Sequence, residues 1–164
     1  MADWTPAGNY LLGQNIDVSS TTQKHALGEI VSAKHATYGV GEFVYLKGVA
    51  STAAGSWVTY NADDYSTALL AANAIGPVAV SMSANVAGQW GWYQINGKAV
   101  GKALASFADN ANVYATATAG SIDDAVVAGD RVKRAKGASA VDTPSTGLAE
   151  FEIDRPFMDD ALAA

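Results

Sequence analysis

Two histidines, His25 and His35, are the residues of this 164-residue sequence best suited to general-base or metal chemistry. A histidine activates a hydroxyl only when the fold holds it beside the nucleophile, and no Gly-x-Ser-x-Gly motif surrounds any serine. The two histidines are ten residues apart without an acidic triad near them, which is poor spacing for a metal site. We therefore interpret both as surface histidines.

Three pairs of adjacent carboxylates are the next candidates. They are Asp63 with Asp64, Asp123 with Asp124, and Asp159 with Asp160. Neighbouring side chains of a strand point to opposite faces, so adjacent acids make poor acid–base partners. We interpret them as solvated turn residues and keep a loose calcium site at Asp123 and Asp124 as the alternative. The sequence thus predicts no catalytic, metal-binding or cofactor-binding residue, and we expect the protein not to be an enzyme.

Trp90, Trp92 and Tyr93 form the densest aromatic group in the sequence. In a strand, Trp90 and Trp92 lie on one face and Tyr93 on the other. Three interpretations remain open at this stage. The rings supply bulk to the core, form an interface with a subunit or partner, or stack on sugar rings.

Charge and cysteine content exclude several classes of function. The formal charge of −6 disfavours a nucleic-acid surface, because contacts to phosphates need lysine and arginine. We interpret the one basic cluster as a solvated strand rather than a phosphate site. It comprises Arg131, Lys133, Arg134 and Lys136. The absence of cysteine excludes disulfides, cysteine-based zinc sites and iron–sulfur clusters.

The sequence also carries no signal for a membrane or for export. No apolar run approaches the roughly 18 residues of a membrane-spanning helix. The first residues lack the basic and apolar segments of a secretory signal. We therefore expect synthesis in a cytoplasm and no membrane partner.

Short strands are the elements that must position these residues. Alternating or β-branched segments separated by Gly, Asn and Asp predict strands at residues 29–33, 42–47, 57–60, 77–83, 90–95, 98–104, 112–116, 130–138 and 148–153. Asn96 and Gly97 predict a type I′ hairpin between two of them. Residues 64–74 are ambiguous between helix and strand, and we favour strand and loop. The expected fold is all-β, a small β-barrel or β-sandwich of short antiparallel strands.

The first 27 residues differ from the rest, since neither a helical nor an alternating period holds across them. We expect an extended N-terminal arm at 1–27, a β-barrel domain at 28–157 and a C-terminal tail at 158–164. The arm's apolar residues Trp4, Tyr10, Leu11 and Leu12 predict docking on a partner surface rather than a solvated terminus. With 33 alanines and 16 glycines, the core holds many small side chains, and we expect partners to contribute to its stability.

Three parts of the sequence resemble the capsid decoration, or cement, proteins of tailed bacteriophages. These are residues 41–52 (GEFVYLKGVAST), residues 112–124 (NVYATATAGSIDD), and residues 147–150 (GLAE) with 155–157 (RPF). The resemblance covers about residues 27 to 157 and consists of strand-and-turn phrases rather than a catalytic signature. It implies a β-barrel module without catalytic residues and supplies no motif for capsid contact.

The resemblance implies a protein made in the host cytoplasm that binds the outer surface of a phage capsid. There it would bridge subunits of the major capsid protein and stabilise the head. We expect a homo-oligomer, a trimer or dimer, and our candidates for partner contacts are the arm residues together with Trp90 and Trp92. The alternatives are another virion module, such as a tail or fibre β-domain, and a carbohydrate-binding β-module that uses Trp90 and Trp92.

Overall fold

The computed structural model describes residues 4–9 and 12–159. This part of the chain contains eleven strands and no helix, so the expected all-β fold is confirmed. The strands are β1 (Thr5–Pro6), β2 (Ile30–His35), β3 (Gly39–Lys47), β4 (Trp57–Tyr60), β5 (Thr67–Leu69), β6 (Ile75–Ser81), β7 (Trp90–Lys102), β8 (Asn112–Ala115), β9 (Ile122–Asp123), β10 (Arg131–Gly137) and β11 (Leu148–Asp159). Residues 64–74 hold turns and the short β5, as the strand-and-loop interpretation expected.

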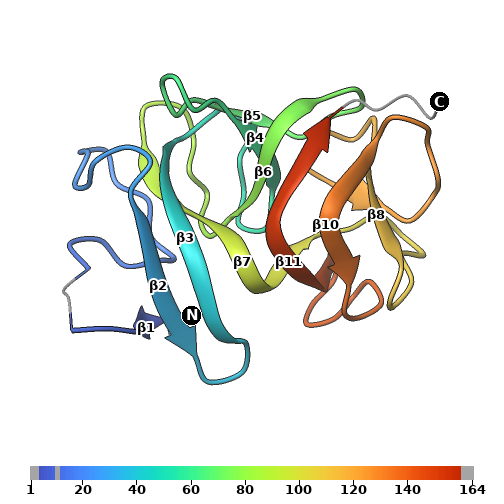
Figure 1. Cartoon of the computed structure of the whole chain (residues 1–164), viewed down its shortest axis with the longest axis horizontal. Helices are drawn as coiled ribbons and strands as arrows, with labels where there is room; N and C mark the ends of the chain where they lie inside the picture. The colour runs from blue at the N-terminus through green and yellow to red at the C-terminus, as the bar shows by residue number, and fades with distance from the viewer. Residues whose placement is uncertain (1–3, 10–11, 160–164) are drawn as a thin grey trace.

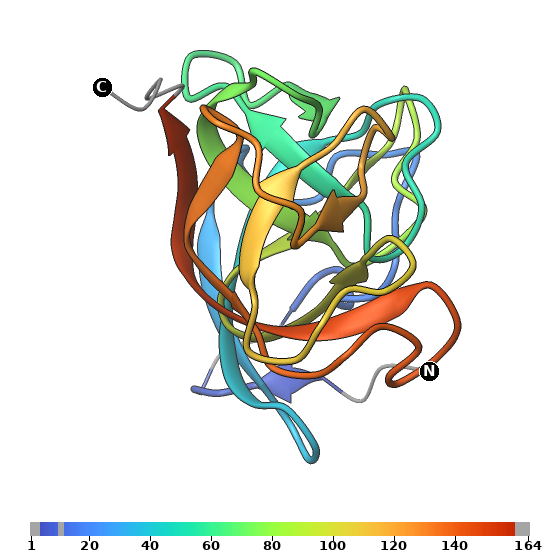
Figure 2. The same ribbon diagram turned by 90° about the vertical axis from the view of Figure 1, so that its right-hand side faces the viewer.

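All eleven strands belong to one antiparallel sheet, which curls strongly on itself (Figure 1, Figure 2). The order along its main path is β1-β2-β3-β7-β6-β11-β10-β8-β9, and β4 joins β6 with β5 beyond it. Within the described residues no pairing connects the end strands β1 and β9. The sheet is therefore not closed into a barrel, and that form of the prediction is wrong.

The hairpin expected at Asn96 and Gly97 is also wrong, because β7 runs through both residues as one strand. Its first half pairs with β3 and its second half with β11. Asn96 is opposite Glu42 on one side and Asp154 on the other, so it marks the place where β7 changes partner. Gly97 has a φ of 98°, and the register against β3 shifts beside it. The positive φ bends the strand instead of reversing it.

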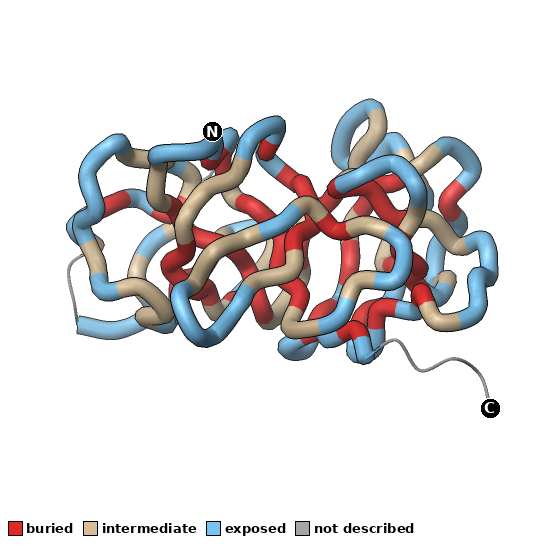
Figure 3. Tube along the Cα trace, turned by 90° about the horizontal axis from the view of Figure 1, so that it is seen from above, coloured by how far each residue is buried: buried red, intermediate tan, exposed pale blue. Residues whose placement is uncertain are grey.

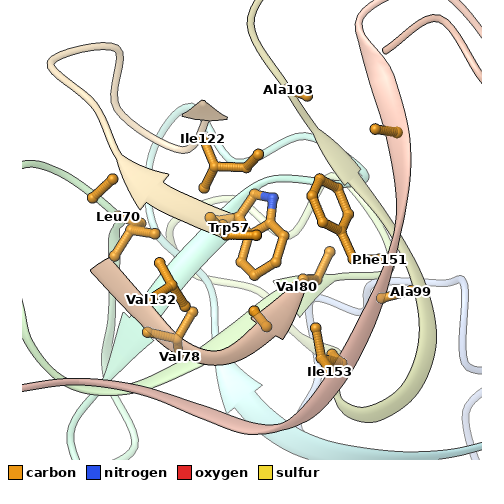
Figure 4. Close-up of a cluster of buried hydrophobic side chains, with 14 of the residues drawn as sticks. Trp57, Leu70, Val78, Val80, Ala99, Ala103, Ile122, Val132, Phe151 and Ile153 are labelled. Atoms are coloured by element: carbon orange, nitrogen blue, oxygen red, sulfur yellow. The ribbon is translucent and has the colours of Figure 1, made fainter. Parts of the chain in front are cut away.

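The largest core cluster lies between β4, β6, β7, β8, β10 and β11. Figure 4 shows Trp57 at its centre, between Leu70, Ile122 and Phe151. The rings of Trp57 and Phe151 meet edge to face with centroids 4.9 Å apart. A Cβ at Gly101 would lie only 2.5 Å from Trp57 Nε1. Small residues on the strands are therefore what makes room for the few large rings.

Two further clusters cover the two faces of β3. Phe43 and Tyr45 lie in one, while Val44 and Leu46 lie in the other, so both faces of this strand are covered. Buried residues follow the strands, and exposed residues gather in the connecting loops (Figure 3).

The described part of the N-terminal segment packs on this same sheet. Ile16 is fully buried in the cluster that contains Phe43 and Tyr45, and β1 pairs with β2. Ser20 forms an isolated bridge with Trp90. The segment thus completes the chain's own core. At the other end, β11 continues to Asp159, past the expected start of the tail at residue 158.

Candidate functional site

The aromatic residues of β7 lie in the interior. Trp92 and Tyr93 have no exposed surface, and Trp90 is partly buried. Trp92 packs edge to face against Tyr45 and His25, and its Nε1 donates a hydrogen bond to the Gln14 carbonyl oxygen at 3.0 Å. The structure therefore supports the core interpretation for Trp92. The expectation that Trp92 contacts a partner or a sugar is corrected, because its own chain covers the ring.

The apolar arm residues that the structure describes also contact their own chain. Trp4 and Leu12 are half-buried and pack against the cluster around Phe43. The Trp4 ring is 4.8 Å from the Phe43 ring, edge to face. Tyr10 and Leu11 lie outside the described residues. For Trp4 and Leu12, the packing against β3 accounts for the apolar side chains without a partner.

Both histidines keep some exposed surface, as expected, but they are partly buried in aromatic surroundings. His25 lies against Tyr45 and Trp92, and its Nδ1 is 3.2 Å from Glu29 Oε2. His35 stacks on Tyr38 with ring centroids 4.7 Å apart. Among residues 4–9 and 12–159, no group of three His, Cys, Asp or Glu side chains is placed to hold a metal ion.

Several members of the carboxylate pairs have structural partners, while Asp160 lies outside the described residues. Asp124 accepts a hydrogen bond from the Ala108 backbone N–H at 2.9 Å, and Asp159 pairs with Lys133. The hydroxyl and the backbone N–H of Ser66 both donate hydrogen bonds to the Asp64 carboxylate. These two hydrogen bonds lower the pKa of Asp64, and the bond from the hydroxyl has the larger effect. Asp64 thus belongs to a turn, as expected.

The basic cluster occupies strand β10, as predicted, and its four cationic side chains are exposed. Lys133 and Lys136 form salt bridges with carboxylates of the neighbouring strand β11, Lys133 with Asp159 and Lys136 with Glu152. The Arg131 guanidinium donates to Asn112 on β8. These cross-strand partners describe a solvated strand surface.

A cleft of about 850 Å³ lies between the N-terminal segment and the strands β6 and β7. Its residues come from seven separate stretches of the chain. They are Trp4, Asp17, Val18, Ser19, His35, Tyr38, Ala54, Gly55, Ser81, Met82, Ser83, Ala84, Gln94, Lys98, Val100 and Leu148. The β2–β3 hairpin forms one wall, and β7 carries the floor.

Three rings, those of Trp4, His35 and Tyr38, form the aromatic wall of the cleft. The His35 ring lies 5.1 Å from Trp4 and 4.7 Å from Tyr38, measured between centroids. Burial raises the pKa of Tyr38, the Glu150 carboxylate adds to that rise, and the Lys98 ammonium opposes it. The Tyr38 hydroxyl of the wall therefore stays protonated at physiological pH.

Two polar side chains of the cleft, Lys98 and Gln94, lie on β7. Lys98 Nζ is 2.5 Å from Glu150 Oε2 and 5.9 Å from the centroid of the Tyr38 ring. Gln94 is buried, and its Nε2 donates to the carbonyl oxygens of Asn96 and Lys98. These contacts hold both side chains in place at the bend of β7. The bend therefore shapes the floor of the cleft.

Two exposed apolar surfaces lie away from the cleft. The first, which we call the apolar edge, consists of Ile75, Pro77 and Phe157. Phe157 is opposite Pro77 in the β6–β11 pairing, so these side chains share one face. The second, the valine tip, is formed by Val126 and Val127 in the loop between β9 and β10. Their exposed fractions are 79% and 47%, and that of Ile75 is 64%.

Sequence reasoning missed the cleft, the apolar edge and the valine tip. Tyr38, Gln94 and Lys98 carry no motif, and they meet Trp4 only because β7 pairs with β3 and β1 pairs with β2. The adjacent valines 126 and 127 were a local signal, since they interrupt a turn-rich stretch with apolar residues.

Searches of protein-family models, curated proteins and solved structures find no match to this chain. In the described ranges, no helix is long and apolar enough to cross a membrane.

Proposed function

We propose that this chain is a non-enzymatic structural protein of a tailed-phage virion. In this proposal it binds the outer surface of the capsid and bridges subunits of the major capsid protein as a dimer or trimer. The proposal starts from the sequence resemblance to capsid decoration proteins. The resembling segments correspond to β3 with its following loop, to β8 and β9, and to β11.

The observation that carries the proposal is the presence of two exposed apolar surfaces, the valine tip and the apolar edge. A protein that bridges two capsid subunits needs two places of contact. Exposed apolar side chains grouped on a surface are typical of protein–protein contacts. The tip belongs to the loop before β10, and the edge belongs to β6 and β11. The two adjoin, because Asp130 in the tip's loop accepts a hydrogen bond from the Asn73 backbone N–H at 2.6 Å. Together they can cover the joint between two subunits.

Repetition makes weak contacts of this kind sufficient. A decoration protein occupies many equivalent positions, and an oligomer binds through several sites at once, which raises its apparent affinity without new contacts. Binding to the assembled head then stabilises that head by mass action. This fits a chain whose exposed apolar surfaces are small.

The test uses heads of the phage that encodes this chain, assembled without it. Purified protein is added, and bound protein is measured by co-sedimentation and located by electron microscopy. We expect saturable binding over the head, and a weakening of about tenfold for the double variant V126S/V127S, because about 1.4 kcal/mol of lost contact corresponds to that factor.

The matched control is V40S, which changes a valine of 60% exposure at the opposite end of the sheet, on the β2–β3 hairpin (Figure 1). We expect V40S to bind like the wild type. Wild-type protein that does not bind heads, or a V126S/V127S variant that binds as tightly as V40S, would contradict the proposal. If electron microscopy finds the bound protein only at the tail vertex, the chain would be assigned to a tail or fibre module instead.

A further inference from the structure

We propose that the cleft is a binding site for a neutral oligosaccharide built of pyranose rings. The inference does not depend on the proposed capsid role, because the cleft lies apart from the apolar edge and the valine tip. Its volume of about 850 Å³ falls in the range of roughly 300–1,000 Å³ that is typical of small-molecule sites.

The aromatic wall supplies the first half of the recognition chemistry. One face of a pyranose ring presents C–H groups with a small positive charge, and the face of an aromatic ring is negative and apolar. Trp4, His35 and Tyr38 gather three such rings at the cleft, where His35 stacks on Tyr38 and is tilted against Trp4. All three are half-buried, so each keeps surface that a ligand can cover.

Polar groups on β6 and β7 supply the second half, and among them Lys98 lies over the Tyr38 ring. The cleft contains an ammonium at Lys98, a buried amide at Gln94 and the hydroxyl of Ser81. Sugar hydroxyls both donate and accept hydrogen bonds, so they need a mixed set of this kind. Lys98 and Gln94 are already held by neighbouring groups, so little conformational entropy is lost when a ligand binds.

The charges of the site select a neutral ligand. The Lys98 ammonium is compensated by Glu150 at 2.5 Å, so it offers an anion no unpaired cation. Asp17 lines the same cleft, and the chain as a whole carries a formal charge of −6. Uronic or sialic acids would be repelled, whereas a neutral sugar meets no such penalty.

The test is titration calorimetry of the full chain with maltotriose, N,N′-diacetylchitobiose and a galactobiose, and with trigalacturonate as the acidic comparison. We expect at least one neutral sugar to bind with a dissociation constant below about 1 mM and trigalacturonate to bind at least tenfold more weakly. Tryptophan fluorescence should change on binding, and W4F should lose that change because Trp4 lines the cleft.

Two variants locate the site. Y38A removes one ring of the wall, and K98M removes the ammonium while it keeps the aliphatic stem. Each should weaken sugar binding about tenfold or more. Their matched controls lie outside the cleft: Y60A changes another half-buried tyrosine, and K133M changes another lysine paired with a carboxylate. Both controls should bind like the wild type.

Thermal unfolding of each variant shows whether it is folded, and K98M tests the site even if Y38A unfolds. Absence of binding for every sugar tested would overturn the proposal. So would sugar binding that Y38A and K98M leave unchanged, since the ligand would then lie elsewhere. If no sugar binds, and the cleft residues are protected from hydrogen exchange only when the protein is bound to the capsid, the cleft would be assigned to a protein partner.

Discussion

At the scale of single residues, Gly97 decides the path of the longest strand. Its positive φ lets β7 bend and exchange β3 for β11 as its partner. The bend also brings the backbones close together, since a Cβ on this residue would lie 2.7 Å from the Val40 carbonyl oxygen and 3.1 Å from Gly41 Cα. Both neighbours are backbone atoms, which yield less readily than the end of a side chain. The position therefore requires glycine for conformation and for space.

Replacing Gly97 with alanine should lower the free energy of unfolding more than the same change at Gly88. Gly88 has a φ of 79° but nothing within 4 Å of a built Cβ, so G88A isolates the conformational cost of about 1–2 kcal/mol. G97A adds the clash with Val40 and should cost about 1–3 kcal/mol more. Urea denaturation of both variants measures the difference. Equal losses would mean that the backbone at Gly97 yields without cost.

Four tyrosines should make the fold sensitive to alkali. Burial raises the pKa values of Tyr38, Tyr45, Tyr60 and Tyr93 above the ordinary value of about 10. The folded state then holds these protons more tightly than the unfolded state does. Their contribution to stability is present in full below pH 10 and is lost as the pH rises through the raised values.

Absorbance at 295 nm, which reports tyrosinate, checks this expectation. The native protein should ionise these tyrosines at higher pH than the protein in denaturant does, and the free energy of unfolding should fall above pH 10. Y93F should remove one late-titrating group, because Tyr93 has no exposed surface. Native and denatured titration curves that coincide would show that burial does not hold the protons.

At the scale of elements, the N-terminal segment behaves as part of the sheet. Gln14 is the main link, because its Nε2 donates to the Trp90 carbonyl oxygen at 2.9 Å and its Oε1 accepts from the Tyr45 hydroxyl at 2.7 Å. Both partners belong to strands, β7 and β3, so one side chain ties the segment to two elements.

Gln14→Ala should therefore destabilise the whole fold rather than free the arm alone. The change leaves the buried Tyr45 hydroxyl without the acceptor it uses and should cost about 2–3 kcal/mol. Q23A is the control, since Gln23 is an exposed glutamine of the same segment. Thermal unfolding followed by near-ultraviolet circular dichroism measures both. A Q14A variant as stable as Q23A would indicate that the segment detaches at little cost.

Elements whose structure depends on neighbouring residues in the sequence could be predicted. Elements whose structure depends on pairing with strands far away in the sequence could not. The alternation of Val78 and Val80 against Ala79 reflects two faces of one strand, and the structure confirms it. The Asn96–Gly97 hairpin failed because β11, more than fifty residues away in the sequence, competes for β7 and offers it seven paired positions. Local turn propensity loses against such pairing.

The same distinction explains the candidate sites. Trp92 was singled out correctly as an important aromatic residue, but its burial depends on the arm and on His25, which no local pattern reveals. The cleft joins Trp4, beside β1, to Lys98 on β7, and the strand order β1-β2-β3-β7 brings them together. A set of residues spread over seven stretches leaves no motif in the sequence.

At the scale of the whole molecule, small residues allow close contact between strands but leave each side chain little area to bury. Of 164 residues, 49 are alanine or glycine, and the core depends on a few rings such as Trp57, Phe107 and Phe151. Gly137 shows the dependence, because a Cβ there would lie 2.8 Å from the Phe107 ring. Further burial must therefore come from exposed apolar surface, and the valine tip and the apolar edge hold such surface.

The proposed function then predicts an order of stability. The isolated chain should unfold at the lowest temperature, the oligomer at a higher one and the capsid-bound form at the highest, because each association binds only the folded state. Calorimetry over a hundredfold range of protein concentration, with and without heads, measures the order. The oligomer's transition should rise with concentration, and V126S/V127S should lower the bound form's transition toward that of the free protein. A transition that is independent of concentration and of added heads would show that the exposed valines contribute no burial in any assembly.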